Sequence, residues 1–595
     1  MSAHNKRKFV SNTKKVVSAP VKGEKKPQKV GFLARMQGKP AYTYLFGFLA
    51  IWSLLCILYG DVLYRTEQES FVALDAALMK PVTDMEFGNW YFAGRLALSL
   101  FSCRWIGGTL LALMLTAIVW LINYVCRIPS RLWSIAWLVP LGFFAWYVQL
   151  GYHIFFEVEP SVFLLVPMLT FMALALVALP VSFLLRQPFR KGEKTKNRLT
   201  LALLLLVVAG VAGCICGLQG FTFLVLFFSA FALCTGAFLL EFLWSEKPKT
   251  SGKHSVSFGL LAIILVTAGA WYAASYINDN EITSCRQQNR MMEGDWQGMI
   301  EDGLAARQPN RTVAAYYAIG LVFTDQILDR LFQIPFHYPD ARLNERSKND
   351  EYGLLLPDCN YAAGLLNPAY HSAFEHVVSN GLRLRHLKRM AICSILNDEP
   401  LLAKKYMRIL SLVPFEKAFV EKYEPMIENR DLIKEDPELS HVMSLYPHES
   451  RFEQYYRQPT FMGYNMGLLS GSDATLITSA AATLYSKDLR SFMLRAMAFQ
   501  QKGWPLPQCM QEAIVLYDMT NPNDHALDRF KGSVSDYVMT QVQAFATAAK
   551  AYVGDKDAMR DNLRQNWLGS YFYYYYCENN NPNQVAKSSS NSGVN

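Results

Sequence analysis

One uncharged run of apolar residues divides the chain into two unlike halves. Residues Val256–Ile277 span 22 positions without a charged side chain, follow three lysines, and end among Trp271, Tyr272 and Tyr276. A run of this length and apolarity crosses a bilayer, and aromatic residues gather at the interface where it emerges. Apolar runs alternate with short loops before it, whereas the pattern after it is typical of a water-soluble domain. The sequence therefore predicts a membrane half followed by a soluble half.

The composition agrees with this division. The 595 residues are 52% hydrophobic and 18% charged, with a net charge of +9. The positive charge is concentrated in the first 41 residues, which hold eleven Lys or Arg against the single acidic residue Glu24. Such a basic tail orients a membrane protein, so we expect the lipid bilayer as a partner and no nucleic acid.

Basic residues also predict the orientation of the crossings. With the amino terminus in the cytoplasm, the inner segments hold 22 Lys or Arg and the outer segments hold four. The soluble half then lies outside the cytoplasm, in the periplasm of a bacterium with two membranes. A re-entrant hairpin around Gln219 and Gly220 is the open alternative, and it would reverse that placement. The seven predicted transmembrane helices are 42–59, 106–126, 132–152, 161–185, 199–219, 221–244 and 256–277.

The soluble half shows the 3.6-residue periodicity of amphipathic helices, which predicts an all-α protein. A turn and an acidic residue precede a helical segment at Asp295, Asp398 and Asp555, as a helix N-cap requires. Helical-hairpin repeats of the TPR type use such turns, although the spacing here is irregular. The predicted domains are a disordered basic cytoplasmic tail (1–41), the seven-helix transmembrane bundle (42–277), a soluble TPR-like helical-repeat domain (278–578) and a disordered tail (579–595).

Helix pairs can be predicted within the soluble half. Segments 368–381, 401–413 and 473–486 are each followed directly by a second helical segment. The spacing of Trp296, Ile300 and Leu304 places them on one helix face, which we expect to pack against a helix over 312–328. We expect residues 280–580 to fold without the membrane half.

The first outer loop holds the candidate catalytic residues. Asp61, Glu67 and Glu69 follow the first crossing closely. Polytopic glycosyltransferases that move a sugar from a lipid carrier use carboxylates in such a position as a general base or metal ligand. An outer loop is also acidic simply because basic residues are excluded from it, so both the catalytic and the structural interpretation stay open.

Two other groups are weaker candidates. Glu241, with His153, Glu157 and Glu159, lies near the ends of crossings, where a carboxylate can simply reach water. The aromatic run 571–576 can stack on a sugar or cap the last helix of an array. No nucleophile, phosphate-loop or metal-ligand spacing is present, so the sequence predicts no cofactor and no metal, and it leaves enzymatic activity undecided.

The order of these elements resembles an uncharacterised family of bacterial polytopic inner-membrane proteins with a carboxyl-terminal TPR-like region. That resemblance implies the architecture and no catalytic residue. We therefore expect a scaffold that binds periplasmic or envelope proteins and assembles a cell-envelope complex, with a lipid-linked-sugar glycosyltransferase as the alternative. The matching segments are 64–71, 292–296, 366–368, 403–406, 414–415, 484–489 and the terminal tyrosine-rich block.

Overall fold

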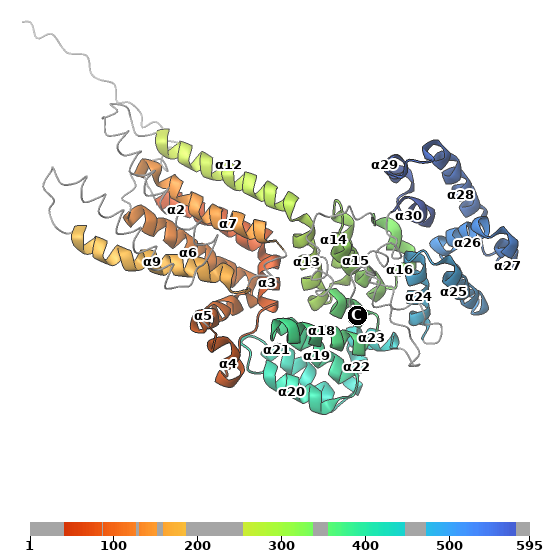
Figure 1. Ribbon diagram of the computed structural model, residues 1–595, viewed down its shortest axis with the longest axis horizontal. Helices are drawn as coiled ribbons and strands as arrows, with labels where there is room; N and C mark the ends of the chain where they lie inside the picture. Colours follow the sequence, from red (N-terminus) through yellow and green to blue (C-terminus); the bar gives the residue numbers. More distant parts are fainter. Residues whose placement is uncertain are drawn as a thin grey trace, which may run out of the picture.

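The chain is helical wherever the structure describes it. The computed structural model describes residues 41–85, 87–125, 130–151, 159–185, 254–336, 355–446 and 472–578. Within these ranges every regular element is an α, 3-10 or π helix (Figure 1). The predicted all-α class is confirmed for this part of the chain. The tail expected over 579–595 lies outside the described residues, as does the tail expected over 1–41 except for Ala41.

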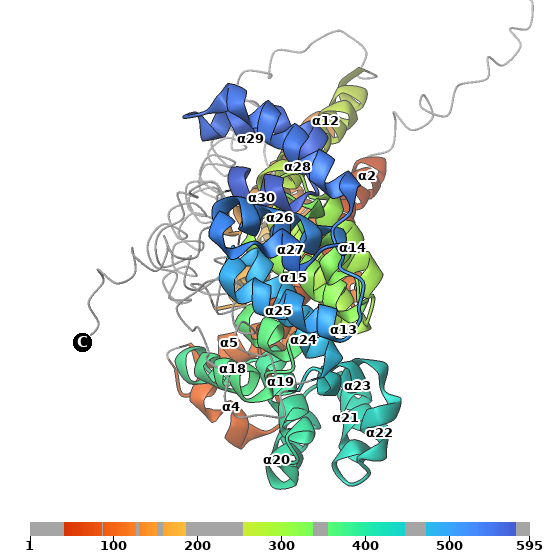
Figure 2. The same cartoon turned by 90° about the vertical axis from the view of Figure 1, so that its right-hand side faces the viewer.

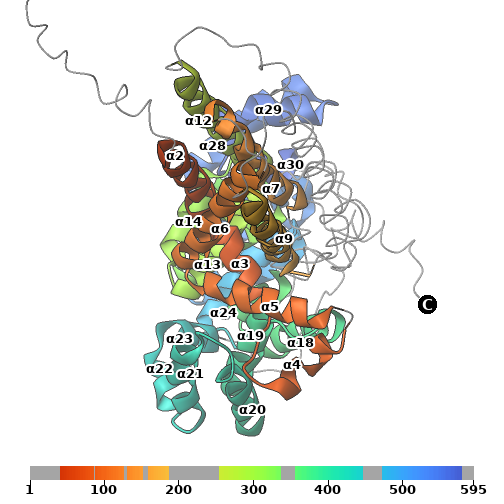
Figure 3. The ribbon, with the colours of Figure 1, turned by 90° about the vertical axis from the view of Figure 1, so that its left-hand side faces the viewer.

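The amino-terminal helices form a bundle in which α2, α6, α7, α9 and α12 run beside one another (Figures 1 and 3). Their apolar side chains meet in one core that includes Leu54, Leu115 and Phe163. The elements are α2 (Ala41–Trp52), η1 (Ser53–Leu58), α3 (Gly60–Gln68), α4 (Ala76–Thr83), α5 (Gly88–Leu98), η2 (Ser99–Ser102), α6 (Arg104–Val125), η3 (Ser130–Trp137), α7 (Leu138–Leu150), α9 (Val162–Leu185) and α12 (His254–Ile277).

Fewer helices than predicted have the length and apolarity of a membrane crossing. Within the described residues these are the helices Arg104–Val125 and Trp133–Leu150, and a third if the bent pair Tyr42–Leu58 and Gly60–Gln68 is one span. The described residues thus contain two or three helices that are long and apolar enough to cross a membrane, and they do not support the predicted seven-helix bundle. Shorter apolar helical stretches at Val162–Ala175 and Ile263–Ile277 fall within two more of the predicted crossings. The crossings predicted over 199–219 and 221–244 lie outside the described residues.

The first crossing does not lead into a loop, as the sequence suggested, but into another helix. The π helix η1 closes with a hydrogen bond from Tyr59 N to Leu54 O of 3.0 Å. The chain then bends by 60° and continues as α3. Asp61 and Glu67 therefore stand on a helix that turns away from the direction of the first crossing.

The soluble half is a succession of helices in which neighbours in sequence pack on one another, and Figure 2 views it from its carboxyl-terminal end. The stretch 355–362 is also helical. The elements are α13 (Asp279–Glu293), α14 (Trp296–Ala305), α15 (Arg311–Phe323), α16 (Ile327–Arg330), η4 (Leu331–Gln333), α18 (Leu366–Asn380), α19 (Leu384–Leu396), α20 (Pro400–Leu410), α21 (Lys417–Tyr423), η5 (Glu424–Ile427), α22 (Asp431–Glu435), α23 (Pro437–Ser444), α24 (Asp473–Tyr485), α25 (Leu489–Gln501), α26 (Gln508–Thr520), η7 (Pro522–Asp524), α27 (Ala526–Arg529), α28 (Asp536–Ala549), η8 (Lys550–Tyr552), α29 (Lys556–Trp567) and α30 (Tyr571–Cys577).

Two of the three predicted N-caps are confirmed. The Asp295 side chain accepts a hydrogen bond from Gly298 N at the start of α14, and Asp555 accepts one from Ala558 N at the start of α29. The prediction for Asp398 is wrong. Its φ of 61° places it in the left-handed turn before α20, and that helix starts instead with Pro400, whose fixed φ suits the first helical turn.

The predicted helix pairs also form. α18 packs on α19 and α24 packs on α25, while α20 is followed by the shorter α21. The face predicted around Trp296 meets α15 as expected, with Ile300 fully buried. Leu304, however, is 39% exposed, so it does not belong to the buried face of α14.

The segment after α3 belongs to the core of the soluble half. Phe71, Val72 and Met79 are buried in the same hydrophobic cluster as the residues of α15, α19 and α26. Two main-chain hydrogen bonds fix the segment, from Leu384 N to Ser70 O (3.0 Å) and from Leu74 N to Leu412 O (2.8 Å). All three views accordingly place α4 beside α18. The segment after α3 therefore fastens the amino-terminal bundle to the helices that follow α12.

Candidate functional site

The three candidate carboxylates do not line an open site. Asp61, Glu67 and Glu69 are 6%, 4% and 2% exposed, and each contacts side chains from other parts of the chain. Burying a charge is costly unless it is paired and hydrogen-bonded. The partners of each carboxylate therefore define what it does.

Glu69 is surrounded by cations. Its Oε1 lies 2.8 Å from Arg65 Nε on α3 and 3.2 Å from Arg385 Nη1 on α19. Arg383 donates to the main-chain oxygen of Glu69 over 2.6 Å. Burial alone would raise the pKa of the Glu69 carboxyl, but Arg65 and Arg385 outweigh burial and hold the pKa well below its usual range. Glu69 is therefore a fixed anion at neutral pH.

The ion pairs continue beyond Arg385. Its Nη2 also bonds to Asp358, which accepts further hydrogen bonds from Arg389 Nη2 (2.8 Å) and from the Tyr316 hydroxyl (2.9 Å). We call Arg65, Glu69, Arg385, Asp358 and Arg389 the ionic junction. It is a buried row of alternating charge that joins α3 to the helical stretch 355–362 and to α19.

Asp61 joins three helices. Its Oδ1 lies 3.0 Å from Arg104 Nη1 on α6 and accepts a hydrogen bond of 3.0 Å from Asn289 Nδ2 on α13. Arg286 Nε approaches its Oδ2 at 3.5 Å. Both carboxylate oxygens are therefore occupied by groups of the protein, one from α6 and two from α13.

Glu67 is a buried carboxyl with a different character. Burial raises its pKa to about 8, and the positive charge of Lys388 opposes that rise. Its Oε2 accepts a hydrogen bond of 2.6 Å from Gln68, while Lys388 itself pairs with Glu416 at 2.7 Å. Near neutral pH the Glu67 carboxyl is largely protonated, and in that state it adds no charge to the buried row.

The other residues considered from the sequence are placed as follows. Glu159 forms a two-point ion pair with Arg95, whose Nε lies 2.6 Å from Glu159 Oε1. His153, Glu157 and Glu241 lie outside the described residues. In the aromatic run, Tyr571, Phe572, Tyr573 and Tyr574 are at most 1% exposed. Most of the run therefore belongs to the core around the last helix, as the capping interpretation required.

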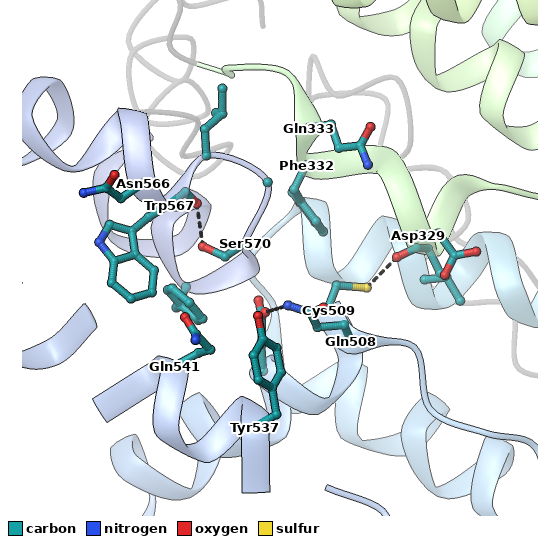
Figure 4. Close-up of a pocket in the computed structure, with 15 residues that line it drawn as sticks. Asp329, Phe332, Gln333, Gln508, Cys509, Tyr537, Gln541, Asn566, Trp567 and Ser570 are labelled. Atoms are coloured by element: carbon teal, nitrogen blue, oxygen red, sulfur yellow. Dashed lines mark hydrogen bonds between the residues drawn. The ribbon is translucent and has the colours of Figure 1, made fainter. Parts of the chain in front are cut away.

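Sequence reasoning missed a polar cleft near the carboxyl-terminal end. It has a volume of about 430 Å³ and lies between η4, α26, α28 and α29 (Figure 4). No short motif marked it, because its walls come from segments more than 200 positions apart. Its polar lining consists mainly of side-chain amides and two carboxylates, among them Gln333, Gln508, Gln541 and Asn566.

The buried carboxyl Glu512 belongs to the wall of this cleft. Its Oε1 accepts a hydrogen bond of 2.8 Å from Gln508, and its Oε2 accepts one from Tyr571 N at 2.5 Å. Cys509 donates its thiol proton to Leu328 O at 2.8 Å (Figure 4). These bonds link α26 to α30 and to α16, so the helices that line this side of the cleft are held in fixed positions.

The fold and these contacts define an all-helical protein whose apolar bundle and helix-pair domain are joined by buried ion pairs. Residues 36–578 match the family model described as a family of unknown function (DUF6057), and the chain belongs to that family. No curated protein and no solved structure is detectably similar to the chain. Among the described residues, no group of three or more His, Cys, Asp or Glu side chains is arranged to hold a metal ion.

Proposed function

We propose that this protein is a multi-pass scaffold of a bacterial inner membrane. In this proposal seven helices cross the bilayer, the amino terminus is cytoplasmic, and a TPR-like domain over 278–578 stands in the periplasm. That domain binds protein partners and assembles them into a cell-envelope complex. Stacked helix pairs present extended surfaces that suit a helix or peptide of a partner.

The observation that carries the proposal is the way in which the helix-pair domain is fastened. α12 ends at Ile277 and α13 begins at Asp279, so only Asn278 separates the apolar bundle from the domain. The ionic junction adds a second, buried attachment through α3 and α19. A domain held at two places keeps one orientation relative to the bundle, which is useful for a scaffold that positions a partner.

The surface of the helix pairs supports a protein partner. Val378 on α18, Leu401 on α20 and Phe415 after α20 are 69%, 86% and 62% exposed. The hydroxyls of Tyr370 and Tyr406 lie 2.7 Å apart and hold α18 to α20. These exposed apolar side chains on and beside two linked helices are available for contact with another protein.

The glycosyltransferase alternative receives less support from this geometry. It needs at least one of Asp61, Glu67 and Glu69 to face a substrate at the membrane surface. Each is instead buried and bonded to groups of the protein itself. Their positions favour a structural role, and the scaffold is the function that the described residues support better.

Photo-crosslinking in membranes tests the scaffold. A photoreactive amino acid at Leu401 or Phe415 of the full chain should give defined adducts with one or a few envelope proteins, because these side chains contact the partner. The same probe at Lys531, an exposed position in the turn between α27 and α28, serves as the control. Adducts equally abundant at all three positions, or absent at Leu401 and Phe415, would contradict the proposal.

Reporter fusions test the topology separately. A periplasmic phosphatase reporter fused after residue 290 should be active, and one fused after residue 196 should be inactive, if the soluble half is periplasmic. The opposite pattern would place the helix-pair domain in the cytoplasm and remove the envelope partner from the proposal.

A further inference from the structure

The polar cleft near the carboxyl-terminal end is separate from the ionic junction and plays no part in the proposed scaffold. Its volume of about 430 Å³ falls within the range of about 300 to 1,000 Å³ that small-molecule sites occupy. Figure 4 shows that the labelled side chains surround the cleft from several sides. They come from η4, α26, α28 and α29.

Side-chain amides dominate the polar surface of the cleft. Gln333, Gln508, Gln541 and Asn566 come from four different elements. An amide offers both a donor and an acceptor, as a sugar hydroxyl does, so the two match without either being charged. The amides of Gln541 and Asn566 make no hydrogen bond to any residue that the structure describes, which leaves them available to a ligand.

Aromatic rings supply the apolar part of the lining. Tyr537 on α28 is 61% exposed, and Trp567 at the end of α29 is half-buried. Phe545 and Phe572 support the Trp567 ring edge to face, with centroids 5.7 and 5.5 Å away. A braced, partly exposed indole beside amides suits the apolar C–H face of a pyranose ring.

The charge of the lining excludes an anionic ligand. None of the fifteen residues that line the cleft is Lys, Arg or His, whereas Asp329 and Glu512 are acidic. A phosphate, a sulfated glycan or the free carboxylate of a peptide would meet repulsion and find no cation. A neutral ligand rich in hydroxyls meets no such cost, and the Asp329 carboxylate can accept hydrogen bonds from it.

We propose that the cleft between η4, α26, α28 and α29 binds a neutral oligosaccharide. One sugar ring stacks on Trp567 or Tyr537, and the amides of Gln541 and Asn566 bond its hydroxyls. This site does not depend on the proposed scaffold function, since it uses neither the ionic junction nor the exposed residues of α18 and α20.

The test uses the purified full chain in a detergent without a sugar head group, applied to an array of neutral and acidic glycans. The best neutral glycan is then titrated calorimetrically against the parent protein and three variants. Gln541→Ala and Asn566→Ala remove amides of the cleft. Gln543→Ala, two residues further along α28 and exposed, is the matched control outside the lining.

The proposal requires binding of a neutral glycan that each cleft variant weakens by about three- to tenfold, the effect of losing one or two hydrogen bonds. Gln543→Ala should bind like the parent, and acidic glycans of equal length should bind more weakly. Binding of no neutral glycan on the array would overturn the proposal. So would binding that is insensitive to Gln541→Ala and Asn566→Ala when their circular dichroism spectra match the parent, or tighter binding of acidic than of neutral glycans of equal length.

Discussion

Glu69 and Arg385 meet across 316 positions of sequence, with Arg385 Nη1 3.2 Å from Glu69 Oε1. Both side chains are buried, Glu69 directly after α3 and Arg385 on α19. The pair exists only when these two parts are assembled. The loss of stability when this ion pair is removed therefore measures how much it contributes to holding the two parts together.

Glu69→Gln should destabilise the whole protein by roughly 3 to 5 kcal/mol, because it leaves the guanidinium groups of Arg65 and Arg385 buried without that anion. Thermal unfolding of the full chain in detergent measures the change. Glu375→Gln is the matched control, since Glu375 is exposed and its ion pair is with His371 on its own helix. A melting temperature no lower than that of the control would show that the ionic junction does not hold the halves together.

Stability should fall as the pH rises from about 5 to 8. Burial raises the pKa of Glu67 and of Glu281 to about 8, from 4.5 for an exposed carboxyl. Between these values the unfolded chain ionises while the folded protein keeps its protons, so each group removes about 1.4 kcal/mol of stability per pH unit. Glu67→Gln should reduce the slope, as measured by unfolding at several pH values, and the exposed Glu421→Gln should not. An unchanged slope in Glu67→Gln would refute the raised pKa.

Trp296→Ala should cost roughly 2 to 3 kcal/mol. The indole lies flat on Phe323, with ring centroids 3.9 Å apart and planes within 7°, and Phe323 in turn faces His441. The ring is half-buried, so the loss stays below the ~3 to 5 kcal/mol of a fully buried aromatic residue. Chemical unfolding of the full chain measures it, with Trp296→Phe as the variant that keeps the stack. Equal losses in both variants would mean that the stack contributes nothing.

A fragment that contains only residues 278–578 should be less stable than the same helices in the full chain, because it lacks part of its hydrophobic core. The sequence predicted that residues 280–580 fold alone, but Phe71, Val72 and Met79 fill part of their core. A fragment of 280–578 should therefore melt at a lower temperature than the same fragment with a synthetic peptide of residues 60–85, because the peptide restores the buried apolar contacts. A scrambled peptide of the same composition is the control. No rise with the native peptide would mean that the segment is dispensable for the domain.

The helix pairs and two of the N-caps could be predicted because their signals are local. Asp295 and Asp555 each precede a helix by one residue, and the pairing of α18 with α19 follows from a short connection between two amphipathic segments. The packing of Trp296 against α15 could likewise be predicted from the sequence, because α15 is the next helix along the chain.

The roles of the acidic residues could not be predicted in this way. Asp61 and Glu69 are bonded to Asn289, Arg383 and Arg385, more than 220 positions further along the chain. No spacing pattern encodes such a contact, so a buried ion pair and a catalytic carboxylate look alike in the sequence. The cleft could not be predicted for the same reason, because its side-chain amides come from four elements that are far apart in the sequence.

Asn278 sets the direction in which the helix-pair domain faces. The nitrogen of its side-chain amide lies within hydrogen-bond distance of the Tyr59 hydroxyl, Val148 O and the Glu281 carboxyl, and these contacts fix the turn between α12 and α13. A helix advances about 1.5 Å and rotates about 100° with each residue. One residue gained or lost between Ile277 and Asp279 would therefore swing every later surface by more than a quarter turn about the axis of α13. Which side of the domain faces back toward the bundle and which faces away from it is thus a matter of helical phase, counted from this asparagine.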